Sequence, residues 1–349
     1  MKHVCSCKLT LSIIALALFF SLVGCSRESD IAISYVVEPL GRYTETEVSL
    51  PSGLENIIGL QSGADASSVN LVGTVSTFDN NAGAQLIWYT ADKDTLEWTE
   101  AAKISLGSIQ NVTAAAWDST DTLYVCYPSP ESSYSTLAYI NNDTIIPVYD
   151  IESDTPIKSI NISAGNEVVV QDKYDVSAFS SDGEKIITVA DAEAGSSDTE
   201  VTSKQETYAV SGNKLVLIEK GEMLFYSLDT SSPALDYTIS APSSSPETQQ
   251  VMTTLSDGTW ALMNSSGLYR VVYNSSMLEQ IFDSSIGNPM FPRIELLGLT
   301  ELGQFTFLLL GHNGSGYVMY KYTYDAEAPV FPETIVEAEA YIAYSSDAD

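Results

Sequence analysis

Basic residues are scarce in this sequence. The 349 residues include 15 Lys and Arg against 46 Asp and Glu, which gives a formal net charge of −31. Binding to nucleic-acid phosphates needs a basic patch, so a nucleic-acid partner is not expected. An anionic membrane surface would also repel such a chain. The same self-repulsion favours solubility in a protein exposed to its surroundings.

Histidine is also scarce, and several catalytic motifs are missing. Of the two histidines only His312 lies beyond residue 24, so zinc ligation by His and Cys is not expected. The sequence has no EF-hand calcium loop, no Gly-Lys-Ser/Thr phosphate loop and no Gly-x-Ser-x-Gly elbow. Paired carboxylates suit glycosidase or lyase chemistry, but with 46 acids some pair always looks plausible. We therefore predict no enzyme, no cofactor and no metal site.

The N-terminus has the pattern of an export signal. Lys2 and Lys8 stand in a segment without acids, and an apolar run from Leu9 to Phe20 follows. This order of a basic region and an apolar region is typical of a secretory signal. The run is shorter than the roughly 20 apolar residues that a membrane-spanning helix needs. We predict a signal peptide over residues 1–24.

Leu22-Val23-Gly24-Cys25 closes this signal. Gly24 is small enough for a peptidase pocket, and Cys25 supplies a sulfur that can take lipid. The pattern resembles the lipobox of bacterial lipoproteins, in which the cysteine is diacylated, for example with palmitate, and becomes the new N-terminus. Two acyl chains give a stable anchor, whereas one gives only marginal binding. The resemblance implies a protein held at the cell membrane through lipidated Cys25, on the extracytoplasmic face; an ordinary signal peptide with a chance cysteine is the alternative.

Removal of the signal changes the charge and the thiol inventory. Lys2 and Lys8 are lost with it, so the mature formal charge is 13 − 46 = −33. With Cys25 lipidated, Cys126 is the one thiol left, and no internal disulfide is expected. Cys126 lies in an apolar, strand-like run, which favours a small buried hydrophobe. A nucleophilic cysteine would want a histidine, and His312 is far away in sequence.

Short turn signals recur at a nearly constant spacing. They start at Ser119, Ala164, Ser211, Ser256 and Glu301, which are 45, 47, 45 and 45 residues apart, and an earlier one starts at Ser62, 57 residues before Ser119. Gly, Asn and Asp suit these turns because tight hairpins need residues that tolerate positive φ. The longer first interval is explained by an extra loop at Asp79–Gly83. A repeat of about 45 residues follows.

Each repeat contains about four short strand-like runs. β-branched and large apolar residues follow every turn, as in Leu123–Tyr127 and Phe305–Leu310. Four short strands in 45 residues match one blade of a β-propeller. We therefore predict an all-β fold, a propeller of six blades with four antiparallel strands each. Seven blades, if residues 31–42 or 329–349 add a strand, and a stacked pair of β-sandwiches are the alternatives.

The sixth repeat lacks its fourth strand. Tyr43–Leu50 alternates Thr and aliphatic residues with Glu and Ser, and it precedes the first repeat. We predict that it closes the ring by pairing with Tyr317–Tyr324, because closure removes an exposed strand edge. The predicted domains are a signal peptide (1–24), a lipid anchor and tether (25–42), the propeller (43–325), and a linker and C-terminal tail (326–349).

Aromatic and glycine-rich stretches offer two further candidates. Trp88, Trp98, Trp117 and Trp260 could line a sugar-binding face, although three of them, Trp88, Trp117 and Trp260, sit in strands where rings pack between sheets. Gly311–Gly316 is predicted to be a hairpin turn of the last blade. Calcium held in a central channel by scattered carboxylates and carbonyls stays open. No ligand-binding residue is assigned.

The lipobox, the repeats and the exit Tyr322-Thr323-Tyr324-Asp325…Pro332-Glu333-Thr334 together suggest a family. They resemble the propeller region ahead of the solute-binding domain in some lipoproteins of Gram-positive ABC importers. That two-lobed domain is missing from this sequence, so solute capture is not carried over.

The resemblance implies a binding or scaffolding module beside a nutrient (carbohydrate) ABC importer, with a protein or glycan partner. Loops at one end of the ring would recognise this partner without bond chemistry. An envelope-assembly scaffold lipoprotein and a carbohydrate-active propeller enzyme are the alternatives.

Overall fold

The computed structural model describes most of the repeat region. The described residues are 42–77, 83–109, 111–129, 134–153, 155–172, 175–190, 207–219, 221–229, 234–242, 250–264, 267–273, 278–283, 294–303 and 306–325. The signal with Leu22, Val23, Gly24 and Cys25, most of the loop at 79–83, and the tail 326–349 lie outside them. Tyr43–Asp325 forms one compact unit.

The regular elements of the described residues are all strands, and no helix that could span a membrane is found among these residues. The strands, in chain order, are β1 (Arg42–Glu47), β2 (Asn56–Ser62), β3 (Ser68–Thr77), β4 (Gly83–Asp92), β5 (Trp98–Ser105), β6 (Ala114–Trp117), β7 (Leu123–Pro128), β8 (Ser135–Asn141), β9 (Thr144–Ile151), β10 (Ser159–Ile162), β11 (Val168–Gln171), β12 (Asp175–Phe179), β13 (Lys185–Ala190), β14 (Thr207–Ser211), β15 (Lys214–Glu219), β16 (Glu222–Ser227), β17 (Ala234–Ser240), β18 (Gln250–Thr254), β19 (Trp260–Asn264), β20 (Gly267–Val271), β21 (Glu279–Asp283), β22 (Glu295–Gly303), β23 (Thr306–His312) and β24 (Tyr317–Asp325).

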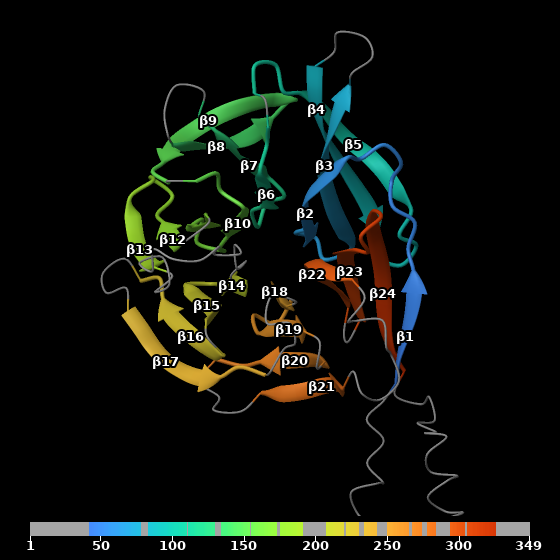
Figure 1. Ribbon diagram of the computed structural model, residues 1–349, viewed down its shortest axis with the longest axis vertical. Coiled ribbons are helices and arrows are strands. Elements are labelled where there is room, and N and C mark those ends of the chain that lie inside the picture. The colour runs from blue at the N-terminus through green and yellow to red at the C-terminus, as the bar shows by residue number, and fades with distance from the viewer. Residues whose placement is uncertain are drawn as a thin grey trace, which may run out of the picture. The chain divides into compact units, whose positions relative to one another are not determined.

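These strands make six four-stranded antiparallel sheets that circle a common axis (Figure 1). One edge strand of each sheet lies innermost, and these inner strands contact one another in the closed order β2, β6, β10, β14, β18, β22 and back to β2. The predicted six-bladed β-propeller is confirmed. The sandwich alternative is wrong, and the described part of the chain contains no seventh sheet.

The ring closes through the N-terminal strand. β1 is the outermost strand of the last sheet, whose order is β1-β24-β23-β22. Just past its end the Val48 amide donates to the Met319 carbonyl at 2.9 Å, and the Tyr322 hydroxyl donates to a Glu45 carboxylate oxygen at 2.5 Å. This is the pairing predicted from the alternating pattern of Tyr43–Leu50. Blade 6 therefore combines the two ends of the propeller sequence.

The predicted turns join the first and second strands of the blades. Asp121 and Asn166 have positive φ of 59° and 63°, and Gly258 has 81°, as tight turns require. The turn predicted to start at Glu301 is wrong in its start, because β22 continues to Gly303, with an irregularity in its pairing with β23. The Gly311–Gly316 turn lies between β23 and β24, as predicted.

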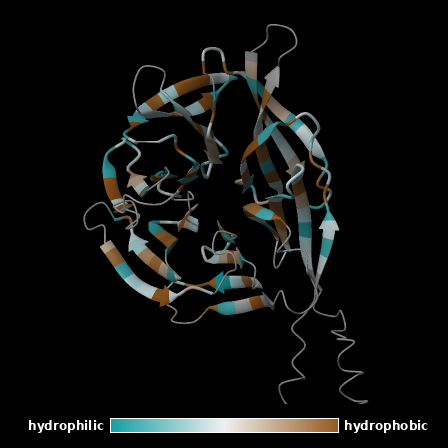
Figure 2. Ribbon diagram, viewed as in Figure 1, coloured by the Kyte–Doolittle hydropathy of each residue, from teal (hydrophilic) through white to brown (hydrophobic). Residues whose placement is uncertain are grey.

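Hydrophobic clusters fill the spaces between neighbouring blades, one cluster for each of the six interfaces. Each strand turns alternate side chains to the blade before and the blade after, and in second strands such as β11 and β19 every residue is buried. Apolar positions accordingly recur in strands all around the ring (Figure 2). Fully burying one large apolar side chain contributes roughly 1.5–3 kcal/mol, so these interfaces supply the main stabilisation of the ring.

The inner strands of blades 1 and 6 have the same irregularity in their pairing with the second strand. In blade 1 the register slips between Ile57 and Gly59, opposite Gly73. In blade 6 the same slip occurs opposite Gly311. A Cβ on Gly73 would lie 2.5 Å from the Asn56 carbonyl oxygen. Glycine is therefore required there because the irregular strand presses its backbone onto the neighbouring strand.

Candidate functional site

A central channel runs along the axis of the ring, with a cavity volume of about 790 Å³. All six inner strands contribute to its wall: Gln61 on β2, Ala115 on β6, Asn161 on β10, Val210 on β14, Thr253 on β18 and Thr300 on β22. Each inner strand is the edge of its sheet, so the backbone groups on that edge have no strand partner. The channel therefore exposes main-chain donors and acceptors that need hydrogen bonds.

Side chains from neighbouring blades occupy part of these edges. The Gln61 amide donates to the Trp117 carbonyl at 2.8 Å and accepts from the Trp117 amide at 3.1 Å. The Thr254 hydroxyl donates to the Val210 carbonyl at 2.6 Å. These contacts join blade 1 to blade 2 and blade 5 to blade 4. The inner strands thus form a connected wall in which some polar groups are used to hold the ring together.

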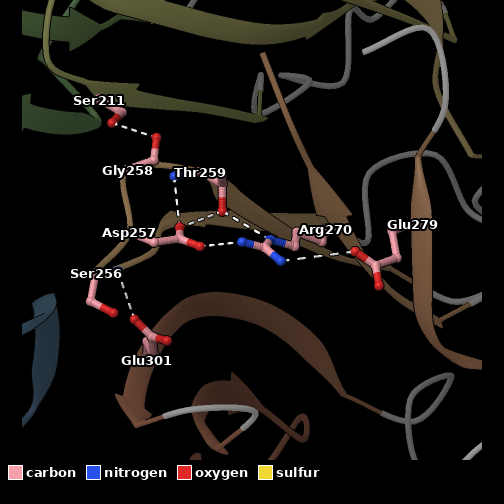
Figure 3. A network of polar contacts seen from close by, with 8 residues as sticks. All are labelled: Ser211, Ser256, Asp257, Gly258, Thr259, Arg270, Glu279 and Glu301. Carbon is pink, nitrogen blue, oxygen red and sulfur yellow. Dashed lines mark hydrogen bonds and ion pairs between the residues drawn. The ribbon is translucent and has the colours of Figure 1, made fainter. Parts of the chain in front are cut away.

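The turns between the first and second strands of the blades surround one end of the channel. We call this end the first-turn mouth. Small residues dominate its rim: Gly63, Ala64, Ser119, Ser163, Ser211, Gly212, Ser256 and Gly258. The Ser211 hydroxyl donates to the Gly258 carbonyl at 2.8 Å, and the Ser256 amide donates to Glu301 at 2.7 Å (Figure 3). Blades 4, 5 and 6 are linked in this way at the mouth.

Arg270 contacts the side chains of the turn between the first and second strands of blade 5 (Figure 3). Its guanidinium contacts Asp257, lies 3.2 Å from the Thr259 hydroxyl, and approaches Glu279 at 4.0 Å. Burial alone would raise the pKa of Asp257, but the hydrogen bonds from Thr259 and the Arg270 charge hold it below its usual value. This cation stabilises a turn and does not line the channel.

Four charged residues line the channel: Lys93, Asp118, Lys158 and Glu301. Both carboxylates already accept backbone hydrogen bonds: Asp118 accepts from the Thr120 amide of its own turn at 2.8 Å, and Glu301 accepts from the Ser256 amide of the neighbouring blade. Burial lowers the pKa of Lys93, and the charge of Glu301 opposes this shift. Across the described residues, no three His, Cys, Asp or Glu side chains are grouped to hold a metal ion.

The opposite end of the channel, which we call the second mouth, opens into a pocket of about 620 Å³. Its wall combines the starts of β2 and β24 with the segments that lead into β6 and β10. The polar members are Asn56, Asn111, Thr113, Thr155, Lys158 and Tyr317. Lys158 and Tyr317 also line the channel. The pocket and the channel therefore form one continuous candidate site.

The position of Tyr317 is fixed by the glycine-rich turn before it. The His312 ring meets the Tyr317 ring edge-on, with 5.5 Å between centroids and 81° between planes. The His312 Nδ1 accepts a hydrogen bond from the Gly314 amide at 3.1 Å. Tyr317 is half-buried, so one part of its ring packs and another is exposed.

The tryptophans do not form a common ligand-facing surface. Trp117 and Trp260 are each 1% exposed and pack between blades, so sugar contact by these two is wrong. Trp88 is half-buried and donates from Nε1 to Asn70 at 3.2 Å. Trp98 is half-buried at the outer side, with its Nε1 buried and without a partner.

Cys126 is fully buried, in the cluster between blades 2 and 3. Desolvation raises the pKa of its thiol from 9.0 to about 12, so the nucleophilic thiolate is not formed near neutral pH. The prediction of a small buried hydrophobe is confirmed. The predicted anchor residues Leu22, Val23, Gly24 and Cys25 lie outside the described residues.

No protein-family model matches the chain, and no curated protein matches its sequence. Similar solved structures exist, at very low identity. The structure of a putative gluconolactonase has 8% identity and a TM-score of 0.48, with 81% of this chain and 93% of that chain covered. The WD40 domain of coronin from Toxoplasma gondii has 8% identity and a TM-score of 0.47, with 84% and 89% covered. A gluconolactonase from Xanthomonas campestris has 8% identity and a TM-score of 0.46, with 83% and 99% covered.

These structures require one correction. The sequence led to the prediction that the chain is not an enzyme. That prediction is wrong, because two of the solved structures similar to this chain are named as gluconolactonases, which are enzymes. The missing motifs belong to other folds, so their absence excludes only those chemistries. At 8% identity the likeness concerns the fold alone and transfers no activity.

Proposed function

We propose that the chain is a lipid-anchored, extracytoplasmic binding or scaffolding module that takes its ligand in the central channel. The observation that carries this proposal is the channel itself, about 790 Å³ in volume and lined by all six blades. Ligand pockets usually have volumes of roughly 300–1,000 Å³ and a few well-placed polar groups. Inner-strand backbone groups, hydroxyls and amides supply such groups here.

The charges support an uncharged, polar ligand. The chain has a formal charge of −31, whereas the channel lining holds two lysines and two acids. An anionic ligand would be repelled by the field of the whole protein. Both lining acids already accept backbone hydrogen bonds, which disfavours them as partners for a cation. A neutral glycan segment or an uncharged stretch of a protein partner suits this wall.

The anchor and the location form the second part of the proposal. Cys25 would carry the acyl chains, and residues 25–42 would tether the ring to the extracytoplasmic face of the cell membrane. A nutrient importer for carbohydrates is the partner that the sequence resemblance favours. Mass spectrometry of the purified N-terminal peptide tests this part: we expect diacylated Cys25, and an unmodified Cys25 or retention of residues 1–24 would contradict it. A Cys25→Ser variant should leave the membrane fraction.

Binding is tested with the full chain purified in detergent. We expect calorimetry or a glycan array to detect a ligand, and Thr253→Val to weaken its binding about two- to tenfold, since one hydroxyl in the wall is lost. Thr99→Val, on the exposed outer strand β5, is the matched control and should change nothing. Mass spectrometry of the incubated ligand shows at the same time whether it is converted. The proposal fails if no glycan or protein ligand binds to the folded chain.

A further inference from the structure

The second-mouth pocket differs in character from the rest of this acidic chain. Among the described residues that line it, one is charged, Lys158, although the chain has 46 acids. The other polar members are amides and hydroxyls, above all Asn56, Asn111 and Thr113. Both asparagines are exposed, whereas Thr113 is half-buried and its hydroxyl donates to the Cys126 carbonyl at 3.3 Å. The pocket thus presents hydrogen-bonding groups that are almost all neutral.

Apolar surface and one aromatic ring complete the pocket. Ile57 and Ile58 are half-buried and line its wall. Ile157 also lines the pocket, but it is only 1% exposed and packs in the core between blades 2 and 3. Tyr317 stands at the junction with the channel, held by its edge-on contact with His312. An apolar wall, a fixed aromatic ring and a few amides suit a ligand with one apolar face and a hydroxylated rim.

The segments that present these side chains are held by backbone hydrogen bonds. The Thr113 amide donates to the Cys126 carbonyl at 2.9 Å, and the Lys158 amide donates to the Gln171 carbonyl at 2.7 Å. Each of these hydrogen bonds joins the segment before β6 or β10 to the second strand of its blade. A pocket whose walls are already ordered loses little entropy when a ligand enters.

We propose that the second-mouth pocket is a subsite for an uncharged saccharide. The Tyr317 ring stacks on the apolar face of a pyranose, and the amides of Asn56 and Asn111 exchange hydrogen bonds with its hydroxyls. Lys158 donates to a ring or hydroxyl oxygen. The pocket of about 620 Å³ leads directly into the channel, so a longer glycan can continue along the axis. This inference rests on the proposed function and names the ligand class and the entry side.

The test uses the full chain in detergent and four neutral sugars: maltose, cellobiose, lactose and N-acetylglucosamine. We expect calorimetry to detect at least one of them. Tyr317→Ala should weaken that binding about tenfold, as truncation of an aromatic anchor commonly does. Tyr317→Phe keeps the ring and should bind within about threefold of the parent chain. Asn111→Ala should weaken binding by a smaller factor.

Two controls separate a binding effect from a folding effect. Tyr134→Ala removes an exposed tyrosine, 39% accessible, that does not line the pocket, and it should leave affinity unchanged. Circular dichroism and the unfolding midpoint identify any variant that fails to fold. If Tyr317→Ala does not fold, the Asn111→Ala and Asn56→Ala variants decide in its place.

The outcomes distinguish this inference from the proposed function. Sugar binding that is lost in Thr253→Val but unchanged in Tyr317→Ala and Asn111→Ala overturns the subsite and leaves the channel proposal standing. Stronger binding of glucuronic acid or glucosamine than of all four neutral sugars overturns the ligand class. Failure of every sugar while a protein ligand binds through the channel overturns the inference alone. Failure of every ligand overturns both.

Discussion

Close approach of two backbones decides the residue type at Gly73. A Cβ there would lie 2.5 Å from the Asn56 carbonyl oxygen, whereas a Cβ on Gly298 would meet only ordinary contacts at 3.7 Å. Both glycines belong to the irregular pairings of blades 6 and 1. Gly73 lies on the second strand β3 and Gly298 on the inner strand β22, and the space for a side chain is much larger at Gly298.

We expect Gly73→Ala to lower the free energy of unfolding by about 1–3 kcal/mol, the usual cost of overpacking. Gly298→Ala should leave it unchanged or raise it by up to about 1 kcal/mol, because alanine restricts the unfolded chain. Urea unfolding of both variants measures the difference. Equal losses in the two variants would show that close approach is not the reason for glycine at residue 73.

Because the Cys126 thiol is buried, we expect the free energy of unfolding to depend on pH in the alkaline range. Burial raises its pKa from 9.0 to about 12, so the folded chain keeps this proton at a pH where the unfolded chain has lost it. The contribution of the protonated thiol to stability is therefore complete below about pH 9 and is lost as pH rises toward about 12.

A comparison of the parent chain with Cys126→Ala isolates this effect from that of the buried tyrosines, which both proteins share. We expect the stability advantage of the parent chain to shrink above about pH 9, by at most about 1.4 kcal/mol per pH unit. Urea unfolding at about pH 8, 9.5 and 10.5 measures it. A constant difference across this range would mean that the thiol keeps an ordinary pKa when folded.

At the scale of single elements, the closing strand β1 is the least local part of the fold. Its partner β24 is almost the whole propeller sequence away, so pairing carries a large loop-closure cost. The Val48 amide donates to Met319 at 2.9 Å just past the end of β1, and Val48 packs on the cluster between blades 6 and 1. Both a hydrogen bond and apolar contact thus fasten the strand.

Val48→Pro removes the amide that donates to Met319. Val48→Ala keeps this amide, and both variants lose the packing of the valine side chain on the cluster between blades 6 and 1. We expect the proline variant to be less stable than the alanine variant by about 1 kcal/mol or more. Thermal unfolding of the two variants gives this comparison. Identical midpoints would indicate that the strand is held by its side chains alone.

At the scale of the whole molecule, six similar sheets surround one axis, and position within a sheet should govern local stability. Second strands such as β7 and β19 are paired on both sides, whereas outer strands such as β9 and β17 are paired on one side and mostly exposed. We expect hydrogen exchange, measured by mass spectrometry, to be slowest in the second strands of all six blades and fastest in the outer strands.

A different pattern would change the description of the molecule. If protection follows the blade number instead of the strand position, the blades open as separate units. The first-turn mouth links blades 4, 5 and 6 through Ser211, Gly258, Ser256 and Glu301, and these three blades would then be the ones to exchange together.

The sequence alone determined the architecture of this protein. Turn signals about 45 residues apart, strand-like runs between them and an alternating stretch before the first repeat are local patterns, and they were sufficient to predict six blades and the closing strand. Local patterns suffice because turn chemistry and the two-residue period of a strand act between near neighbours in the chain.

Only the tertiary structure decided where a ligand could bind. Trp117 and Tyr317 both lie in strand-like runs, yet the first is buried between blades and the second stands at the mouth of the channel. Alternation along a strand sends side chains to both neighbouring blades, so exposure depends on what the facing blade supplies. The channel and its second-mouth pocket arise where the inner edge strands of six sheets, far apart in sequence, come together around one axis. No single stretch of sequence can therefore predict them.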